Sequence, residues 1–184
     1  VEHARIEPGH MAASPFVLES MPWSHSLLAL AGWAAVSAAL YFLWRKDRRG
    51  AWVVAGLVLS HWVLDWVTHE PDMPLYPSGD RYGLGLWNSL PATVAVELVM
   101  FVAGVWIYTR ATSSTGAWGG RGLAGLVAFL LLAYGAAEFG TPPTSIDAMP
   151  VVMLAMVALI TLWAWAVDRQ RVNVDGKLPK TTDA

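Results

Sequence analysis

Long apolar stretches alternate with short polar segments along the chain, and their lengths are the first guide to its fold. A helix needs about 20 mostly apolar residues to cross the hydrocarbon core of a bilayer, or about 17 when it stands upright. Five stretches are long enough, and they cover residues 24–44, 51–69, 92–108, 123–139 and 148–167. The pattern therefore predicts an all-α protein, an integral membrane bundle of five transmembrane helices.

Aromatic residues stand near most ends of these five stretches. Such residues form the aromatic belts that anchor membrane helices at the two interfaces. They are Trp23, Trp44, Trp52, Trp66, Trp87, Tyr108, Trp118, Phe139 and Trp165. Their positions support the five predicted spans.

Composition agrees with a membrane protein and excludes several classes of function. The chain is 55% hydrophobic and only 14% charged, which is unusual for a soluble domain of 184 residues. Its 12 basic and 14 acidic residues give no overall positive charge, and no basic run is interleaved with aromatics, so we expect no nucleic-acid partner. With 0 cysteines, the chain has no disulfide, no thiolate metal site and no cysteine nucleophile.

Lys and Arg are unevenly distributed among the segments that join the five stretches. Short cytoplasmic loops of membrane proteins carry the excess of basic residues. The segments after the first, third and fifth stretches contain Arg45, Lys46, Arg48, Arg49, Arg110, Arg121, Arg169, Arg171, Lys177 and Lys180, whereas the opposite segments contain only Arg5 and Arg81. We therefore expect an extracytoplasmic N-terminal extension at residues 1–22, a transmembrane domain at 23–168 and a flexible cytoplasmic tail at 169–184.

Ionisable residues within the predicted spans gather toward the outer face. The cytoplasmic halves of the five stretches contain no Asp, Glu, Lys, Arg or His. The outer halves contain His25, His61, Asp65, His69, Glu97 and Glu138. Ionisable groups are costly inside a bilayer, and groups that converge at one depth usually mark an ion, proton or substrate site.

The second stretch carries the densest set of candidate metal ligands, at His61, Asp65 and His69. Helix positions four apart are about 6 Å from one another, so either adjacent pair can bind one ion. The two histidines are about 12 Å apart on a straight helix, so all three residues cannot close on one ion. Three arrangements remain possible. Two ions can share Asp65, one histidine can contact the ligands without binding the ion, or the helix can be distorted.

Further ligands must come from other segments, and His25, Asp72 and Glu97 are nearest by depth. Imidazole and carboxylate ligands suit a divalent metal ion, and they do not distinguish zinc, manganese and iron. The segment 70–91, between the second and third stretches, is too long for a simple turn, and loops of this length are often functional. We expect it to form a lid over the outer opening.

Two motifs resemble a known family. Ser24-His25 and His61-x-x-x-Asp65-x-x-x-His69-x-x-Asp72, together with Gly83-Leu-Gly-Leu-Trp-Asn88 and Glu97, are similar to the YdjM-like group of small multi-pass bacterial inner-membrane proteins, which are described as metal-dependent hydrolases. The similar positions cover roughly a third of the chain. The resemblance implies a location in the bacterial inner membrane, metal binding by His25, His61, Asp65, His69 and Asp72, and hydrolysis.

Under this hypothesis the bound ion activates water while a carboxylate accepts the proton, and Asp72 and Glu97 are the candidates for that catalytic role. The substrate would reach the site from the outer leaflet. A lipid, a lipid-linked precursor or another membrane amphiphile fits that position.

Other interpretations of the same residues remain open. His61, Asp65 and His69 can form a structural hydrogen-bond network that ties the second helix to its neighbours. A second class of function is a non-catalytic subunit of a larger respiratory or photosynthetic membrane complex, in which the histidines contact other subunits or ligate a haem or pigment. Asp65 favours a small cation over a pigment. A transporter is least supported, because the sequence shows neither broken helices nor a repeated half.

Overall fold

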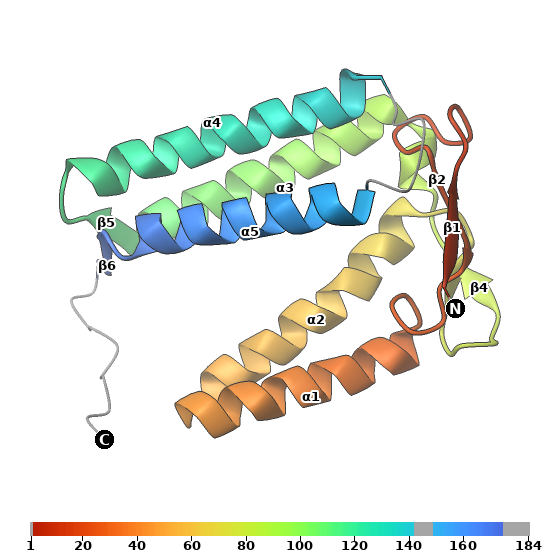
Figure 1. Cartoon of the computed structure of the whole chain (residues 1–184), viewed down its shortest axis with the longest axis horizontal. Helices are drawn as coiled ribbons and strands as arrows, with labels where there is room; N and C mark the ends of the chain where they lie inside the picture. Colours follow the sequence, from red (N-terminus) through yellow and green to blue (C-terminus); the bar gives the residue numbers. More distant parts are fainter. Residues whose placement is uncertain (1, 142–148, 175–184) are drawn as a thin grey trace. The chain divides into compact units, whose positions relative to one another are not determined.

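The computed structural model of the chain describes residues 2–141 and 149–174 (Figure 1). Within them, five helices are long and apolar enough to cross a membrane: α1 (Leu27–Arg45), α2 (Arg48–Thr68), α3 (Leu90–Ala111), α4 (Ala117–Phe139) and α5 (Met149–Asp168). The predicted helical class and its five spans are confirmed. Residue 148, the predicted start of the fifth span, and residues 175–184 of the expected tail lie outside the described residues.

The largest shift in a span boundary is at α4, which begins at Ala117 where the sequence predicts Leu123. Glycines in this segment disfavour a helix on propensity alone. Gly119 is nevertheless buried, and a Cβ atom there would collide with the backbone carbonyl of Gln170. Packing against the residues that follow α5 therefore outweighs the weak propensity, and α4 begins one to two turns earlier than predicted.

Between and beside the helices, residues 2–141 and 149–174 also form three small antiparallel sheets, which the sequence does not predict. Each has two strands. They pair β1 (His3–Ile6) with β2 (Phe16–Ser20), β3 (Met73–Pro74) with β4 (Arg81–Tyr82), and β5 (Thr112–Ser114) with β6 (Arg171–Asn173). A short 3-10 helix, η1 (Leu86–Asn88), precedes α3.

The chain forms two compact units, Val1–Val94 and Ala95–Ala184. In the first unit, α1 and α2 lie side by side, joined by a tight turn at Lys46 and Asp47 (Figure 1). Lys46 has a left-handed backbone with φ of 54°, and the Asp47 carboxylate accepts a hydrogen bond from the Arg49 amide at 2.9 Å. The hairpin places the start of α1 beside the end of α2.

A small apolar core joins this helical hairpin to the segments around it. Its buried members are Leu30 of α1, Trp62 of α2 and Met73 of β3. The indole nitrogen of Trp62 donates to the Pro74 carbonyl at 3.2 Å. These contacts fix the segment that follows α2 against the helix ends.

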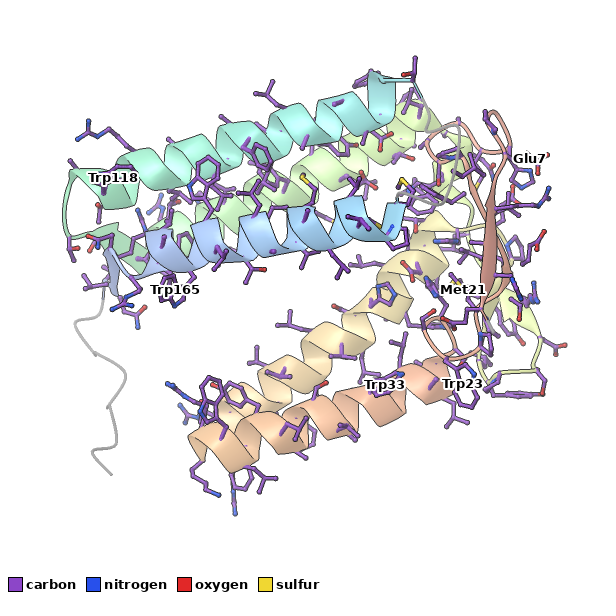
Figure 2. The ribbon with its side chains drawn as sticks, in the orientation of Figure 1. Glu7, Met21, Trp23, Trp33, Trp118 and Trp165 are labelled. Carbon is purple, nitrogen blue, oxygen red and sulfur yellow. The ribbon has the colours of Figure 1, made fainter. Side chains whose placement is uncertain are left out.

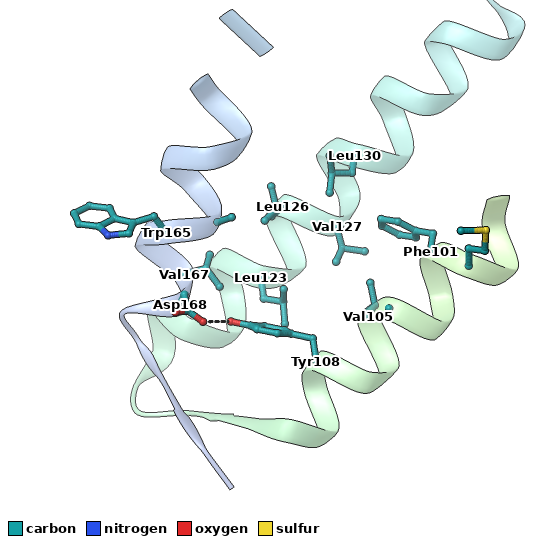
Figure 3. Close-up of a pocket in the computed structure, with 13 residues that line it drawn as sticks. Phe101, Val105, Tyr108, Leu123, Leu126, Val127, Leu130, Trp165, Val167 and Asp168 are labelled. Atoms are coloured by element: carbon teal, nitrogen blue, oxygen red, sulfur yellow. Dashed lines mark hydrogen bonds between the residues drawn. The ribbon is translucent and has the colours of Figure 1, made fainter. Parts of the chain in front are cut away.

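In the second unit, an apolar cavity of about 560 Å³ lies among α3, α4 and α5 (Figure 3). Polar groups close the end nearest β5 and β6. The Tyr108 hydroxyl donates to Asp168 Oδ1 at 3.0 Å, and the Arg171 guanidinium lies 5.3 Å from the centre of the Tyr108 ring. Arg171 also donates to the Thr112 hydroxyl at 2.8 Å and to the Thr112 carbonyl at 2.9 Å.

Large apolar side chains cover the outer surfaces of the helices in both units. Trp52 is 79% exposed and Leu132 is 75% exposed. Figure 2 shows Trp118 and Trp165 near one end of the second unit, and Trp23 and Trp33 near the start of α1. Apolar surfaces with aromatic residues near the helix ends are those that membrane helices present to lipid chains and to the interfaces.

Candidate metal centre

Three predicted ligands come together in the first unit. His25 lies in the turn before α1, and His61 and Asp65 lie four residues apart on α2. One ligand atom from each residue lies within 4.8 Å of the other two. Asp65 Oδ2 is 3.2 Å from His61 Nε2 and 3.7 Å from His25 Nε2.

The carboxylate of Asp65 gives the test of whether this group fits a cation. Its Oδ2 atom is buried and accepts no hydrogen bond of good geometry among the described residues, although His61 Nε2 lies 3.2 Å away. Buried polar atoms almost always have a partner, so each exception calls for an explanation. Two imidazole nitrogens face this oxygen, and a divalent ion between the three atoms would complete its coordination. The donor set of two imidazoles and one carboxylate is common at catalytic zinc sites.

The surroundings of His25 favour the neutral imidazole that metal binding requires. Burial lowers the pKa of its imidazole; Asp65 partly offsets this effect, and the nearby His61 and His69 lower the pKa further. The neutral ring has a lone pair for a metal ion. Ser24 Oγ lies 2.6 Å from His25 Nδ1, so with Nδ1 protonated the ring donates to Ser24 and presents Nε2 to Asp65.

Glu2, in the N-terminal extension, holds the turn that contains His25. Its Oε1 atom accepts hydrogen bonds from the backbone amides of Trp23 and Ser24, each at 2.8 Å. Partial burial raises the pKa of Glu2, but the backbone hydrogen bonds from Ser24 and Trp23 outweigh it, and the pKa lies below its usual value. The sequence gives no sign of this contact, because the extension folds back across more than twenty residues.

His69 and Asp72 form a pair beside the three-residue group. Helix α2 ends at Thr68, so His69 has an extended backbone and its ring leaves the helical direction. His69 Nδ1 is 3.3 Å from Asp72 Oδ2, and the His69 ring packs 4.5 Å from the Trp87 ring. The centres of the His69 and His25 rings are 6.3 Å apart. This placement favours the alternative in which one histidine, His69, contacts the ligands without binding the ion.

The loop predicted to form a lid packs against the end of α2. The Leu84 amide donates to the Trp66 carbonyl at 2.8 Å, and the Gly85 amide donates to the His69 carbonyl at 2.7 Å. Gly83 lies so close to the Glu70 carbonyl that a Cβ atom would collide with it. The loop therefore satisfies the last carbonyls of α2 and fixes the backbone from which His69 and Asp72 project.

Glu97, the other predicted catalytic carboxylate, lies on α3 in the second unit. With Tyr134, Phe101 and Leu130 it lines a cavity of about 310 Å³. Its role at the His/Asp site stays a prediction.

These features define a multi-pass membrane protein with a His/Asp group that can hold a metal ion. Residues 22–171 match the profile of the YdjM inner membrane protein family, so the chain belongs to this family and to the inner membrane. The match confirms the resemblance and extends it from two local motifs to all five helices. No curated protein and no solved structure matches the chain.

Proposed function

We propose that the protein binds one divalent metal ion through His25, His61 and Asp65 and hydrolyses a membrane-associated substrate at this centre. The observation that carries the proposal is the convergence of two imidazole nitrogens, from two different segments, on the buried Asp65 Oδ2 atom at 3.2 and 3.7 Å.

His25, His61 and Asp65 would supply three ligands to a bound ion and leave a further coordination position for water or substrate, as in catalytic zinc sites. When bound, a divalent ion supplies Lewis-acid activation of water and of the scissile ester or phosphoester. Ser24 orients His25, and Trp87 and Asp72 hold His69 beside the ligands. Zinc, manganese and iron all suit this donor set.

Of the two predicted proton acceptors, Asp72 lies in the same unit as the three proposed ligands. Its Oδ1 atom is buried and has no hydrogen-bond partner in residues 2–141 or 149–174, while its Oδ2 atom contacts the His69 ring. A carboxylate held in this way can accept a proton from an attacking water and share it with the imidazole.

We propose that the site opens toward the outer leaflet, where a lipid or lipid-linked substrate would reach it. The basis is the distribution of Lys and Arg, which favours an N-terminus outside and a C-terminus in the cytoplasm. The chain has 0 cysteines, so Ser78→Cys introduces a single reactive thiol. It should react with an impermeant thiol reagent in intact cells, and labelling only after lysis would reverse the orientation.

Metal analysis of the purified protein tests the centre itself. The wild type should retain about one divalent ion per chain, and the His61→Ala/Asp65→Ala double variant should retain close to none. The control is His10→Ala/Glu70→Ala, which removes another histidine–carboxylate pair of the same unit, 3.1 Å apart, and should leave the metal content unchanged. Equal metal content in wild type and the first variant would refute the proposal.

One observation favours a second function, a non-catalytic subunit of a larger membrane complex. The His61 side chain is 48% exposed although it lies on a membrane-spanning helix. An imidazole facing outward in a bilayer would be stabilised by a polar group, haem or pigment of a neighbouring subunit. Under this function, other membrane proteins should copurify in stoichiometric amounts.

A further inference from the structure

A polar cavity of about 230 Å³ lies in the first unit, outside the group formed by His25, His61 and Asp65. Residues 18–22, at the end of the N-terminal hairpin, form one wall. Asp72, Ser78 and Arg81 of the following loop form the other. Residues 2–21 precede the segment that matches the family profile, so one wall is largely built by an extension outside that match.

The polar groups of the cavity are held in place by contacts behind them. Arg81 donates to the Glu19 carbonyl at 3.0 Å. The Glu19 carboxylate is 3.0 Å from the Arg5 guanidinium, which also pairs with Glu7 at 2.8 Å. Asp72 Oδ2 is occupied by His69, while Asp72 Oδ1 is buried and has no partner among the described residues. The walls thus present hydrogen-bond donors and acceptors together, with charges of both signs.

The mixture of donors, acceptors and charges of both signs on the cavity walls determines which kind of ligand fits. A phosphate would face the carboxylates of Asp72 and Glu19, and a bare cation would face the Arg81 guanidinium. A neutral hydroxyl group both donates and accepts hydrogen bonds, so several hydroxyls together match the mixed wall. The volume is below the roughly 300–1,000 Å³ of pockets for drug-sized ligands. It suits a single sugar or glycerol group.

The cavity and the candidate metal centre share a boundary. Asp72 lines the cavity and also contacts His69, whose ring lies 6.3 Å from the His25 ring. Met21 and Pro22 line the cavity and lead into the Ser24-His25 turn. We propose that this cavity binds the neutral polyhydroxyl headgroup, a sugar or glycerol, of the lipid substrate. The role of this cavity as a substrate subsite rests on the proposed hydrolase function. Binding of the headgroup by the cavity does not depend on that function.

Calorimetry on the full chain in a detergent without sugars, such as lauryldimethylamine oxide, tests this assignment. Octyl glucoside and octyl phosphate have the same alkyl chain, so a difference in their affinities comes from the headgroup. Octyl glucoside should bind at least tenfold more tightly than octyl phosphate. Equal binding, or tighter binding of the phosphate, would overturn the assignment.

Two variants locate the binding. Ser78→Trp fills the cavity and should weaken octyl glucoside binding at least tenfold. The matched control is Asp80→Trp, on the same loop but outside the lining, which should bind as the wild type does. Arg81→Leu removes a donor without filling the space and should also weaken binding. Wild-type affinity in both Ser78→Trp and Arg81→Leu would contradict the assignment.

Metal content measured on the same samples separates the two proposals. Headgroup selectivity that is lost in Ser78→Trp while metal is retained supports the cavity as an independent subsite. A wild type that retains metal but does not prefer the glucoside refutes the cavity alone. A wild type that prefers the glucoside but binds no metal refutes the proposed metal centre and leaves the headgroup site in place.

Discussion

Each unit has short paired strands and a cluster of polar side chains at one end of its apolar helices, but the two clusters differ in how well their atoms are paired. In the second unit, Tyr108 donates to Asp168, and Arg171 makes three hydrogen bonds to Thr112 and Gly119. In the first unit, Asp65 Oδ2 and Asp72 Oδ1 accept no hydrogen bond of good geometry among the described residues. A paired cluster such as that of Tyr108 and Arg171 stabilises a fold, whereas buried carboxylate oxygens that face imidazoles leave coordination positions for a ligand.

Gly83→Ala should produce the largest effect on the first unit. The new Cβ atom would collide with the backbone of Glu70, and backbone moves less readily than a side chain. We expect the free energy of unfolding to fall by about 1–3 kcal/mol. Metal retention should also fall, because the backbone of His69 and Asp72 must shift. Thermal unfolding and metal analysis measure both effects.

The control is Gly56→Ala on α2, where a Cβ atom meets nothing within 4 Å. It should raise stability by roughly 0.5–1 kcal/mol, since alanine is the better helix former. If both alanine variants behaved alike, the close contact between the loop and the end of α2 would not matter.

Ser24→Ala should act on metal affinity alone. The variant removes the group that orients the His25 ring, and loss of such a partner typically weakens metal binding about 10–100-fold. Competition with a chelator measures the zinc Kd. Ser60→Ala is the matched control, because the Ser60 hydroxyl donates to the Leu57 carbonyl and not to the His/Asp group. Equal Kd values in Ser24→Ala and wild type would show that Ser24 does not position a ligand.

Arg171→Ala tests whether the polar cluster of the second unit affects metal binding in the first. The variant removes three hydrogen bonds of a partly exposed guanidinium, so we expect the free energy of unfolding to fall by about 1–2 kcal/mol. Metal content of the folded protein should stay at the wild-type value. Loss of metal in folded Arg171→Ala would mean that the two clusters depend on each other.

Glu2→Gln should give the smallest effect, and one that depends on pH. The folded-state pKa of Glu2 is lowered, so its carboxylate adds stability above its usual pKa, and this contribution disappears as pH falls through the lowered value. The melting temperature of wild type should therefore exceed that of Glu2→Gln at pH 7, and the two should converge in acid. A difference that persisted at a pH below the lowered pKa of Glu2, where its carboxyl group is neutral, would exclude the charge of Glu2 as its cause.

The sequence predicts the five spans well because length and apolar composition are enough to define a membrane helix. It also places His61 and Asp65 together, because positions four apart share one face of a helix. The position of His69 depends on where α2 ends, which is set by amides of the loop at Leu84 and Gly85. Such contacts between distant segments leave no periodic signal.

The contribution of the N-terminal extension is likewise invisible in the sequence. Glu2 accepts a hydrogen bond from Ser24, and Arg5 pairs with Glu19 at the polar cavity, through contacts that depend on the β1–β2 hairpin. The three small sheets have strands of two to five residues, too short for a clear alternating pattern. The sequence therefore predicts the ligands of the candidate centre better than the residues that hold them.

X-ray absorption spectroscopy of the zinc-loaded protein shows whether His25, His61 and Asp65 bind the ion. We expect one zinc ion per chain with two imidazole nitrogens at about 2.0–2.1 Å and a carboxylate oxygen at about 2.0–2.2 Å, and loss of the imidazole signal in His25→Ala/His61→Ala. A shell of oxygen atoms without imidazole scattering, or a spectrum unchanged in that variant, would contradict it.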